Sequence, residues 1–147
     1  MKTWRSTFLT LLVVAFSVHL FAHHMAVVVA ADNGVTNLTS VQLGKIFRAE
    51  AKKWTDGREI VLVLHRASSG EAITLEHLNK MTAAQFQAWS NEHRNQVKFV
   101  SSDQEMLTVV ETTPGAVGLV DVRAVNDKVK VLHVDGKLPM EEGYLPH

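Results

Sequence analysis

Residues 59–80 read EIVLVLHRASSGEAITLEHLNK, and this stretch decides the predicted fold. The apolar run 60–64 is short, rich in branched residues and bounded by polar ones, which is typical of a buried strand. Small residues follow at 67–70, and the apolar spacing after them indicates a helix. The stretch therefore predicts a strand that leads through a short turn into a helix N-terminus.

This turn supports two alternative interpretations. The first turn of a helix has unpaired N–H groups and a positive dipole end, and Gly70 lets the backbone approach a ligand, so the turn could hold an anion. Arg66 adds a planar guanidinium suited to carboxylate or phosphate oxygens. Alternatively, Ser68 and Glu71 form an S-x-x-E capping box that needs no ligand. A carboxylate at Glu71 would also place negative charge where the anion should lie.

Composition limits the classes of protein that this chain can belong to. The 147 residues have room for one domain with a core large enough to be stable. There is no cysteine, which excludes disulfides and cysteine-ligated metal sites. The 15 basic and 15 acidic residues give a formal charge of zero, which argues against nucleic acid as a partner.

Residues 1–22 are predicted to be a secretory signal peptide. Lys2 and Arg5 form a basic region, residues 8–21 are mainly apolar, and Ala22 is a candidate cleavage residue. Polar residues interrupt the apolar stretch, which weakens it as a membrane span. We therefore expect a periplasmic or secreted protein that begins near residue 23, with retention as an uncleaved anchor as the alternative.

Strands and helices alternate through the rest of the chain. Strands are predicted at 25–30, 60–64, 97–100, 116–120 and 129–134, and helices at about 40–51, 70–80, 82–93 and 103–112, with a helical turn at 121–125. The short connections between them predict an α/β fold, a three-layer sandwich with a buried central sheet. We expect this domain to span 23–139, followed by an irregular tail at 140–147.

Four motifs, in order along the chain, resemble those of one protein family. Residues 37–47 read NLTSVQLGKIF and are followed by Lys53-Trp54, residues 66–70 read RASSG, residues 113–120 read TPGAVGLV, and a strand and turn follow at 131–139. Together they resemble the phosphate-type periplasmic substrate-binding proteins of ABC transporters. The resemblance implies a single lobe of the type II periplasmic-binding-protein fold.

In that family the ligand lies between two lobes, held by backbone N–H groups, hydroxyls and an arginine. The resemblance implies that Arg66 supplies the guanidinium, with Ser68, Ser69 and Gly70 as hydroxyl and backbone donors. Thr39 is a further candidate, by its position in a loop. The sequence departs from the family at Glu71, where a threonine is usual, and it has no counterpart of the first lobe.

Two hypotheses for the function follow. The first is a non-enzymatic module that binds a small oxyanion, with phosphate as the first candidate and an ABC permease as a possible partner. The alternative is a protein-interaction or sensory module of the cell envelope, in which Glu71 occupies the former anion position. Dimerisation could rebuild a cleft in either case.

We expect neither catalysis nor a cofactor. Ser68 and Ser69 do not lie in a G-x-S-x-G nucleophile elbow, and no base and orienting acid accompany them. We also expect no metal site, because the pair His23-His24 has no further ligand cluster near it in the sequence.

Overall fold

The computed structural model describes residues 24–146. The signal peptide predicted at 1–22 and its cleavage after Ala22 lie outside the described residues. Within the described part of the chain, no helix is both long enough and apolar enough to cross a membrane.

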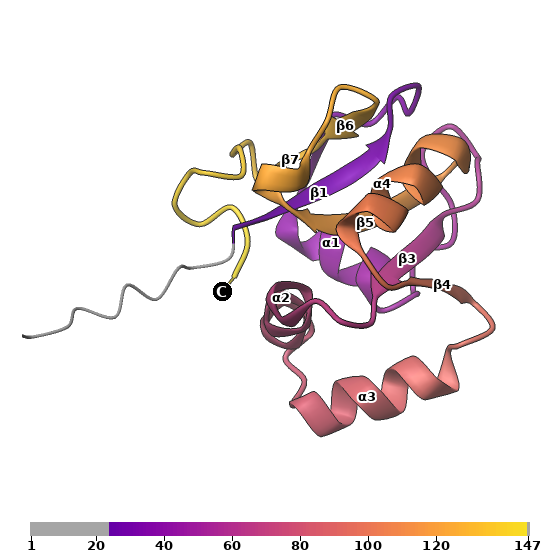
Figure 1. Ribbon diagram of the computed structural model, residues 1–147, viewed down its shortest axis with the longest axis vertical. Coiled ribbons are helices and arrows are strands. Elements are labelled where there is room, and N and C mark those ends of the chain that lie inside the picture. Colours follow the sequence, from indigo (N-terminus) through magenta and orange to yellow (C-terminus); the bar gives the residue numbers. More distant parts are fainter. Residues whose placement is uncertain (1–23, 147) are drawn as a thin grey trace, which may run out of the picture.

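A mixed β-sheet forms the centre of the fold (Figure 1). Within residues 24–146 its strands are β1 (Met25–Ala30), β3 (Val61–His65), β4 (Val97–Val100), β5 (Ala116–Asp121) and β6 (Val129–Val131). They lie in the order β4-β3-β5-β1-β6, in which β3 is parallel to β4 and β5, whereas β1 is antiparallel to β5 and β6. A separate parallel pair joins β2 (Asn37–Leu38) to β7 (His133–Val134).

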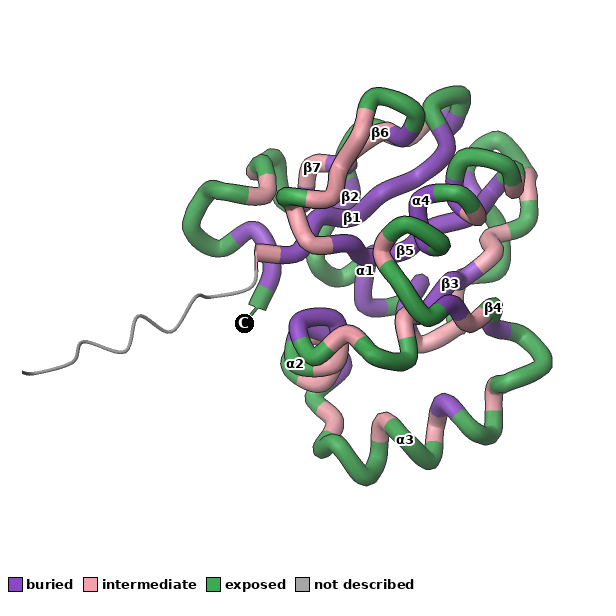
Figure 2. The backbone as a smooth tube through the Cα atoms, in the orientation of Figure 1, coloured by how far each residue is buried: buried purple, intermediate pink, exposed green. Residues whose placement is uncertain are grey.

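Strand β1 is apolar throughout because both faces of the sheet are covered. Side chains alternate along a strand, so Met25, Val27 and Val29 enter one hydrophobic cluster, while Ala26 and Val28 enter the other. All six residues of β1 are buried, and Figure 2 shows β1 and β5 buried along their length. This two-sided burial explains the continuous apolar run, which alternation alone would not produce.

Helices cover both faces of the sheet. The helical segments are α1 (Ser40–Phe47), α2 (Ser69–Asn79), α3 (Ala83–Glu92), α4 (Asp103–Thr112) and a short 3-10 turn, η1 (Val122–Ala124). Helix α4 contributes to the cluster on one face, and α1 and α2 contribute to the cluster on the other. Helix α3 packs against α2 and lies farther from the sheet (Figure 1). The predicted three-layer α/β sandwich of single-lobe size is confirmed.

The motif Thr113-Pro114-Gly115 has a structural role at the start of β5. Gly115 has a φ of +82°, and a Cβ there would lie 2.1 Å from the carbonyl oxygen of Glu59, so only glycine fits. The Gly115 carbonyl accepts hydrogen bonds from the indole of Trp54 at 2.9 Å and from Val61 N–H at 3.0 Å. The motif therefore ends α4, and its Gly115 carbonyl links the loop around Trp54 to the sheet by hydrogen bonds.

Two predicted elements have different bounds in the structure. The helix expected to reach Ala51 ends at Phe47, because Ala49 adopts a left-handed conformation with φ of 58° and turns the chain away. The single strand expected at 129–134 is two strands, because the chain leaves β1 at Leu132 and pairs with β2 instead. The sequence pattern did not predict β2.

The C-terminal segment is irregular, but it packs into the core. Tyr144 and Leu145 are 4% and 7% exposed. The Tyr144 hydroxyl donates to the Leu132 carbonyl at 2.7 Å and accepts from Val27 N–H at 3.1 Å. Leu132 N–H still donates to the Val27 carbonyl at 2.9 Å, and the Tyr144 hydroxyl bridges the other two backbone groups of this pair. Burial raises the pKa of Tyr144 to about 12, and the hydroxyl therefore stays protonated as a donor.

We expect Tyr144→Phe to destabilise the fold. The substitution keeps the ring but leaves the buried Val27 N–H and Leu132 carbonyl without partners, which typically costs about 1–3 kcal/mol. Urea unfolding of both proteins would measure the loss, with an unchanged m-value as the control for two-state behaviour. Equal midpoints would contradict this role for the hydroxyl.

Candidate functional site

Strand β3 passes into α2 through a turn that leaves backbone donors free. The Ser68 hydroxyl caps the helix by accepting from Glu71 N–H at 3.1 Å, and the Ser68 carbonyl accepts from Ala72 N–H at 3.1 Å. Ser69 and Gly70, the first two helical residues, have N–H groups with no acceptor among residues 24–146. Ser69 is exposed and Gly70 is buried. This helix start therefore retains donor capacity.

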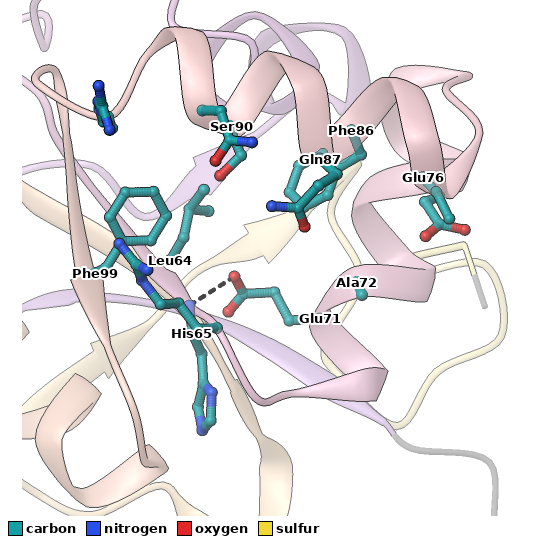
Figure 3. A pocket seen from close by; sticks show the side chains of 13 residues that line it. Leu64, His65, Glu71, Ala72, Glu76, Phe86, Gln87, Ser90 and Phe99 are labelled. Carbon is teal, nitrogen blue, oxygen red and sulfur yellow. Dashed lines mark hydrogen bonds between the residues drawn. The ribbon is translucent and has the colours of Figure 1, made fainter.

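Glu71 forms only half of the expected capping box. Its backbone N–H binds Ser68, but its side chain turns away from the helix start toward the end of β3 (Figure 3). Glu71 Oε1 accepts from His65 N–H at 2.8 Å. The side chain is buried, and within the described structure its Oε2 has no hydrogen-bond partner. The carboxyl group thus joins α2 to β3 and leaves one buried oxygen unsatisfied.

The environment of Glu71 favours its protonated form. Burial raises the pKa of Glu71 well above the ordinary value of 4.5, the hydrogen bond from His65 N–H opposes this rise, and the negative charge of Asp103 adds to it. Asp103 lies at the start of α4, with its Oδ1 3.8 Å from His65 Nε2. Burial therefore favours the protonated carboxyl group, which carries one O–H donor.

A cavity of about 440 Å³ lies between α2, α3 and the ends of β3 and β4. Glu71 lines it, and Leu64, Phe86 and Phe99 give it apolar walls. Arg66 also lines the cavity, with its guanidinium carbon 4.1 Å from the centre of the Phe99 ring. The Arg66 side chain forms no ion pair or hydrogen bond with another described residue, so its charge is available to a ligand.

The structure separates the six candidate residues into three groups. Arg66 and Glu71 line the cavity. The segment 68–70 forms the start of α2, next to the cavity but outside its lining. Thr39 is at the start of α1, where its hydroxyl accepts from Gln42 N–H at 3.1 Å and its own N–H donates to Gln42 Oε1 at 2.8 Å. Thr39 is therefore engaged in a capping box.

Sequence reasoning missed the contribution of α3 and the loop after it. Gln87, Ser90, Asn91 and Arg94 line the cavity. The apolar residues of the segment 82–93 predict a helix. They do not show which of its polar residues face β3. Only the packing of α3 against α2 creates this wall.

A metal centre is not evident in the described structure. Among residues 24–146, no group of three or more His, Asp or Glu side chains is arranged to hold a metal ion. His65 and Asp103 face each other without a third such ligand.

Residues 14–143 match a family model described as a PBP superfamily domain. Among solved structures, an ABC-type phosphate transport receptor from Vibrio cholerae is 25% identical, with a TM-score of 0.64 over 80% of this chain and 48% of the receptor. A putative phosphate ABC transporter substrate-binding protein from Clostridium perfringens, solved with bound phosphate, is 20% identical, with a TM-score of 0.66 over 79% of this chain and 46% of that protein. PstS from Borrelia burgdorferi is 22% identical, with a TM-score of 0.63 over 80% and 49% of the two chains. The present chain spans about half the length of these proteins.

We expect Glu71→Gln to stabilise the fold increasingly as the pH rises. Because the folded-state pKa is raised, the favourable contribution of Glu71 is complete below its ordinary pKa and is lost as the pH rises toward the folded-state pKa. Each unit by which folding raises the pKa of Glu71 corresponds to about 1.4 kcal/mol of folding stability lost at high pH. Glutamine keeps an acceptor for His65 N–H and does not titrate.

Thermal unfolding of both proteins at about pH 4.5 and about pH 8 would measure this difference. Glu76→Gln is the matched control, because it makes the same change of charge on the same helix at a residue that is only partly buried. If the change in stability caused by Glu71→Gln did not depend on pH, or if Glu76→Gln caused the same change, Glu71 would not have a raised pKa in the folded protein.

Proposed function

The chain belongs to the PBP superfamily of domains, and on this premise we propose that it is a non-enzymatic binding protein of the cell envelope that holds a small oxyanion at the start of α2. Phosphate is the first candidate, because the similar solved proteins include phosphate transport receptors. The expected location is the periplasm, and an ABC permease is the expected partner.

The observation that carries this proposal is the pair of unengaged N–H groups at Ser69 and Gly70. They open an 11-residue helix, so the helix dipole adds to their attraction for negative charge. Arg66 precedes Ser69 by three residues and has no carboxylate partner in the part of the chain that the structure describes. Its flexible side chain could pair with an anion at the helix start.

The orientation of Glu71 removes the main electrostatic objection. Its side chain points toward β3 and accepts from His65 N–H, so it does not cover the helix start. Burial raises the pKa of Glu71, which favours the uncharged form of its carboxyl group. This arrangement supports anion binding over the hypothesis that Glu71 permanently replaces the anion.

The affinity should be modest. A single lobe leaves the bound anion open to water on one side, where screening weakens each contact. We expect a dissociation constant in the millimolar range, equivalent to about −4 kcal/mol. A second lobe or a second copy of the chain would exclude water and strengthen binding.

The second candidate function is a protein-interaction or sensory module of the envelope. Large apolar side chains such as Val41 and Met140, which are 66% and 65% exposed, are available for contact with another protein. Under this hypothesis phosphate would have no specific effect on the protein.

We expect phosphate to raise the thermal stability of the chain. At ten times the dissociation constant the gain should be about 1.4 kcal/mol, and sulfate and chloride at matched ionic strength serve as controls. Ser69→Pro should reduce the gain, because proline removes one of the two N–H groups but is tolerated at the first position of a helix. Ser68 already has the extended conformation that a following proline requires.

Ser69→Ala is the matched control, since it removes the hydroxyl and keeps the N–H. It should retain at least part of the phosphate effect. If phosphate stabilises the wild type no more than sulfate does, or if Ser69→Pro responds as strongly as Ser69→Ala, the proposed site is wrong.

A further inference from the structure

The cavity between α2 and α3 has features that phosphate binding at the start of α2 does not use. Glu71 is 2% exposed, and within residues 24–146 its Oε2 has no hydrogen-bond partner. Buried polar atoms are rarely left unsatisfied in native proteins, so this oxygen needs a partner. In Figure 3 Gln87 points from α3 into the same hollow toward which Glu71 extends. Glu71 lines the cavity, so a ligand bound there would lie next to this carboxyl group, and a small rotation of the side chain would bring the two into contact.

The cavity is suited in size and shape to a small organic molecule. Its volume of about 440 Å³ lies within the usual range for ligand sites. Phe86 and Phe99 provide aromatic surface, and Leu64 provides aliphatic surface. These walls would remain exposed to water around a bare inorganic ion, whereas an apolar ligand body would cover them.

The charges that line the cavity favour an anionic group on that ligand. Arg66 and Arg94 contribute two positive charges, and Glu76 contributes one negative charge. Arg66 is stacked on Phe99, which orients its guanidinium edge while leaving its donors unpaired within the described structure. Planar carboxylates match such an edge through two parallel hydrogen bonds.

We propose that this cavity is a second binding site, and that it takes a small carboxylic acid with an aromatic body. The carboxylate pairs with Arg66 and Arg94, the two positive charges that line the cavity. The ring packs against Phe86 and Phe99. One ligand oxygen accepts a hydrogen bond from Glu71, which satisfies the buried Oε2.

Protonation of Glu71 should control this binding. The charged and titratable groups around it are His65 at the end of β3, Arg66 directly after it, Asp103 on α4, Glu76 on its own helix, and Arg94 after α3. Ionised Glu71 would repel a carboxylate and would lose its donor. Binding should therefore weaken as the pH rises, because burial raises the pKa of Glu71 from the acid range.

Nuclear magnetic resonance of the isotope-labelled full chain provides a local measurement. Benzoate is the probe, and its controls are benzamide, benzylamine, acetate and inorganic phosphate. We expect millimolar benzoate to shift the signals of His65 N–H and of the Gln87 side-chain amide in a saturable way. Benzamide and acetate should bind more weakly, because one lacks the charge and the other lacks the ring.

Two variants separate this site from a general attraction for anions. Arg94→Gln should weaken benzoate binding about tenfold, the loss expected for one charge-assisted contact. Lys98→Gln, on the exposed side of β4, makes the same change of charge outside the cavity and should leave binding unchanged. Glu71→Gln should retain binding at low pH and lose its pH dependence, because glutamine remains a neutral donor.

The proposal would be overturned if benzoate caused no saturable shifts, if benzamide or benzylamine bound as well as benzoate, or if Arg94→Gln and Lys98→Gln behaved alike. Arg66 is shared with the phosphate site, so the variants that separate the two sites change other residues. Ser69→Pro, which removes a donor at the start of α2, should leave benzoate binding intact.

Discussion

The hydrogen bond from His65 N–H to the buried Glu71 carboxyl group determines how α2 leaves β3. It joins the last residue of the strand to the first turn of the helix, at a distance of 2.8 Å. Because the carboxyl group turns toward the strand, it does not accept from the N–H groups of Ser69 and Gly70, and it gives one wall of the neighbouring cavity a polar group. Both candidate sites therefore depend on this single contact.

The two sites make different chemical demands. The start of α2 offers backbone donors and a dipole, which suit a compact oxyanion. The cavity offers aromatic walls, two arginines and a buried carboxyl group, which suit a larger acid with an apolar body. Arg66 is close to both, and its long side chain allows it to serve either ligand. Occupation of one site could thus alter the affinity of the other through the position of this residue.

The sequence predicted well those structural features that depend on neighbouring residues. The strands around Val27 and Val63 follow from short apolar runs, and the capping boxes at Thr39 and Thr82 follow from residues three positions apart. Ser102 and Glu105 have the same spacing but form only half of a box, since the Ser102 hydroxyl accepts from Glu105 N–H while the Glu105 carboxylate accepts from Ser101 N–H. Such a box needs a particular side-chain rotamer, and a neighbouring backbone donor competes for the same carboxylate.

The sequence by itself determined the α/β class, the order of its main strands and helices, and a strand–turn–helix unit that carries Arg66 and Gly70, because these features depend on residues close together in the chain. Tertiary structure alone decided that the chain after Val131 pairs with β2 and that Tyr144 hydrogen-bonds to the backbone of Val27 and Leu132. It also placed Arg94 in the lining of the same cavity as Glu71. Each of these features joins segments distant in sequence. Their positions depend on which backbone groups and apolar surfaces remain unpaired once the rest of the fold has formed, and no local pattern contains that information.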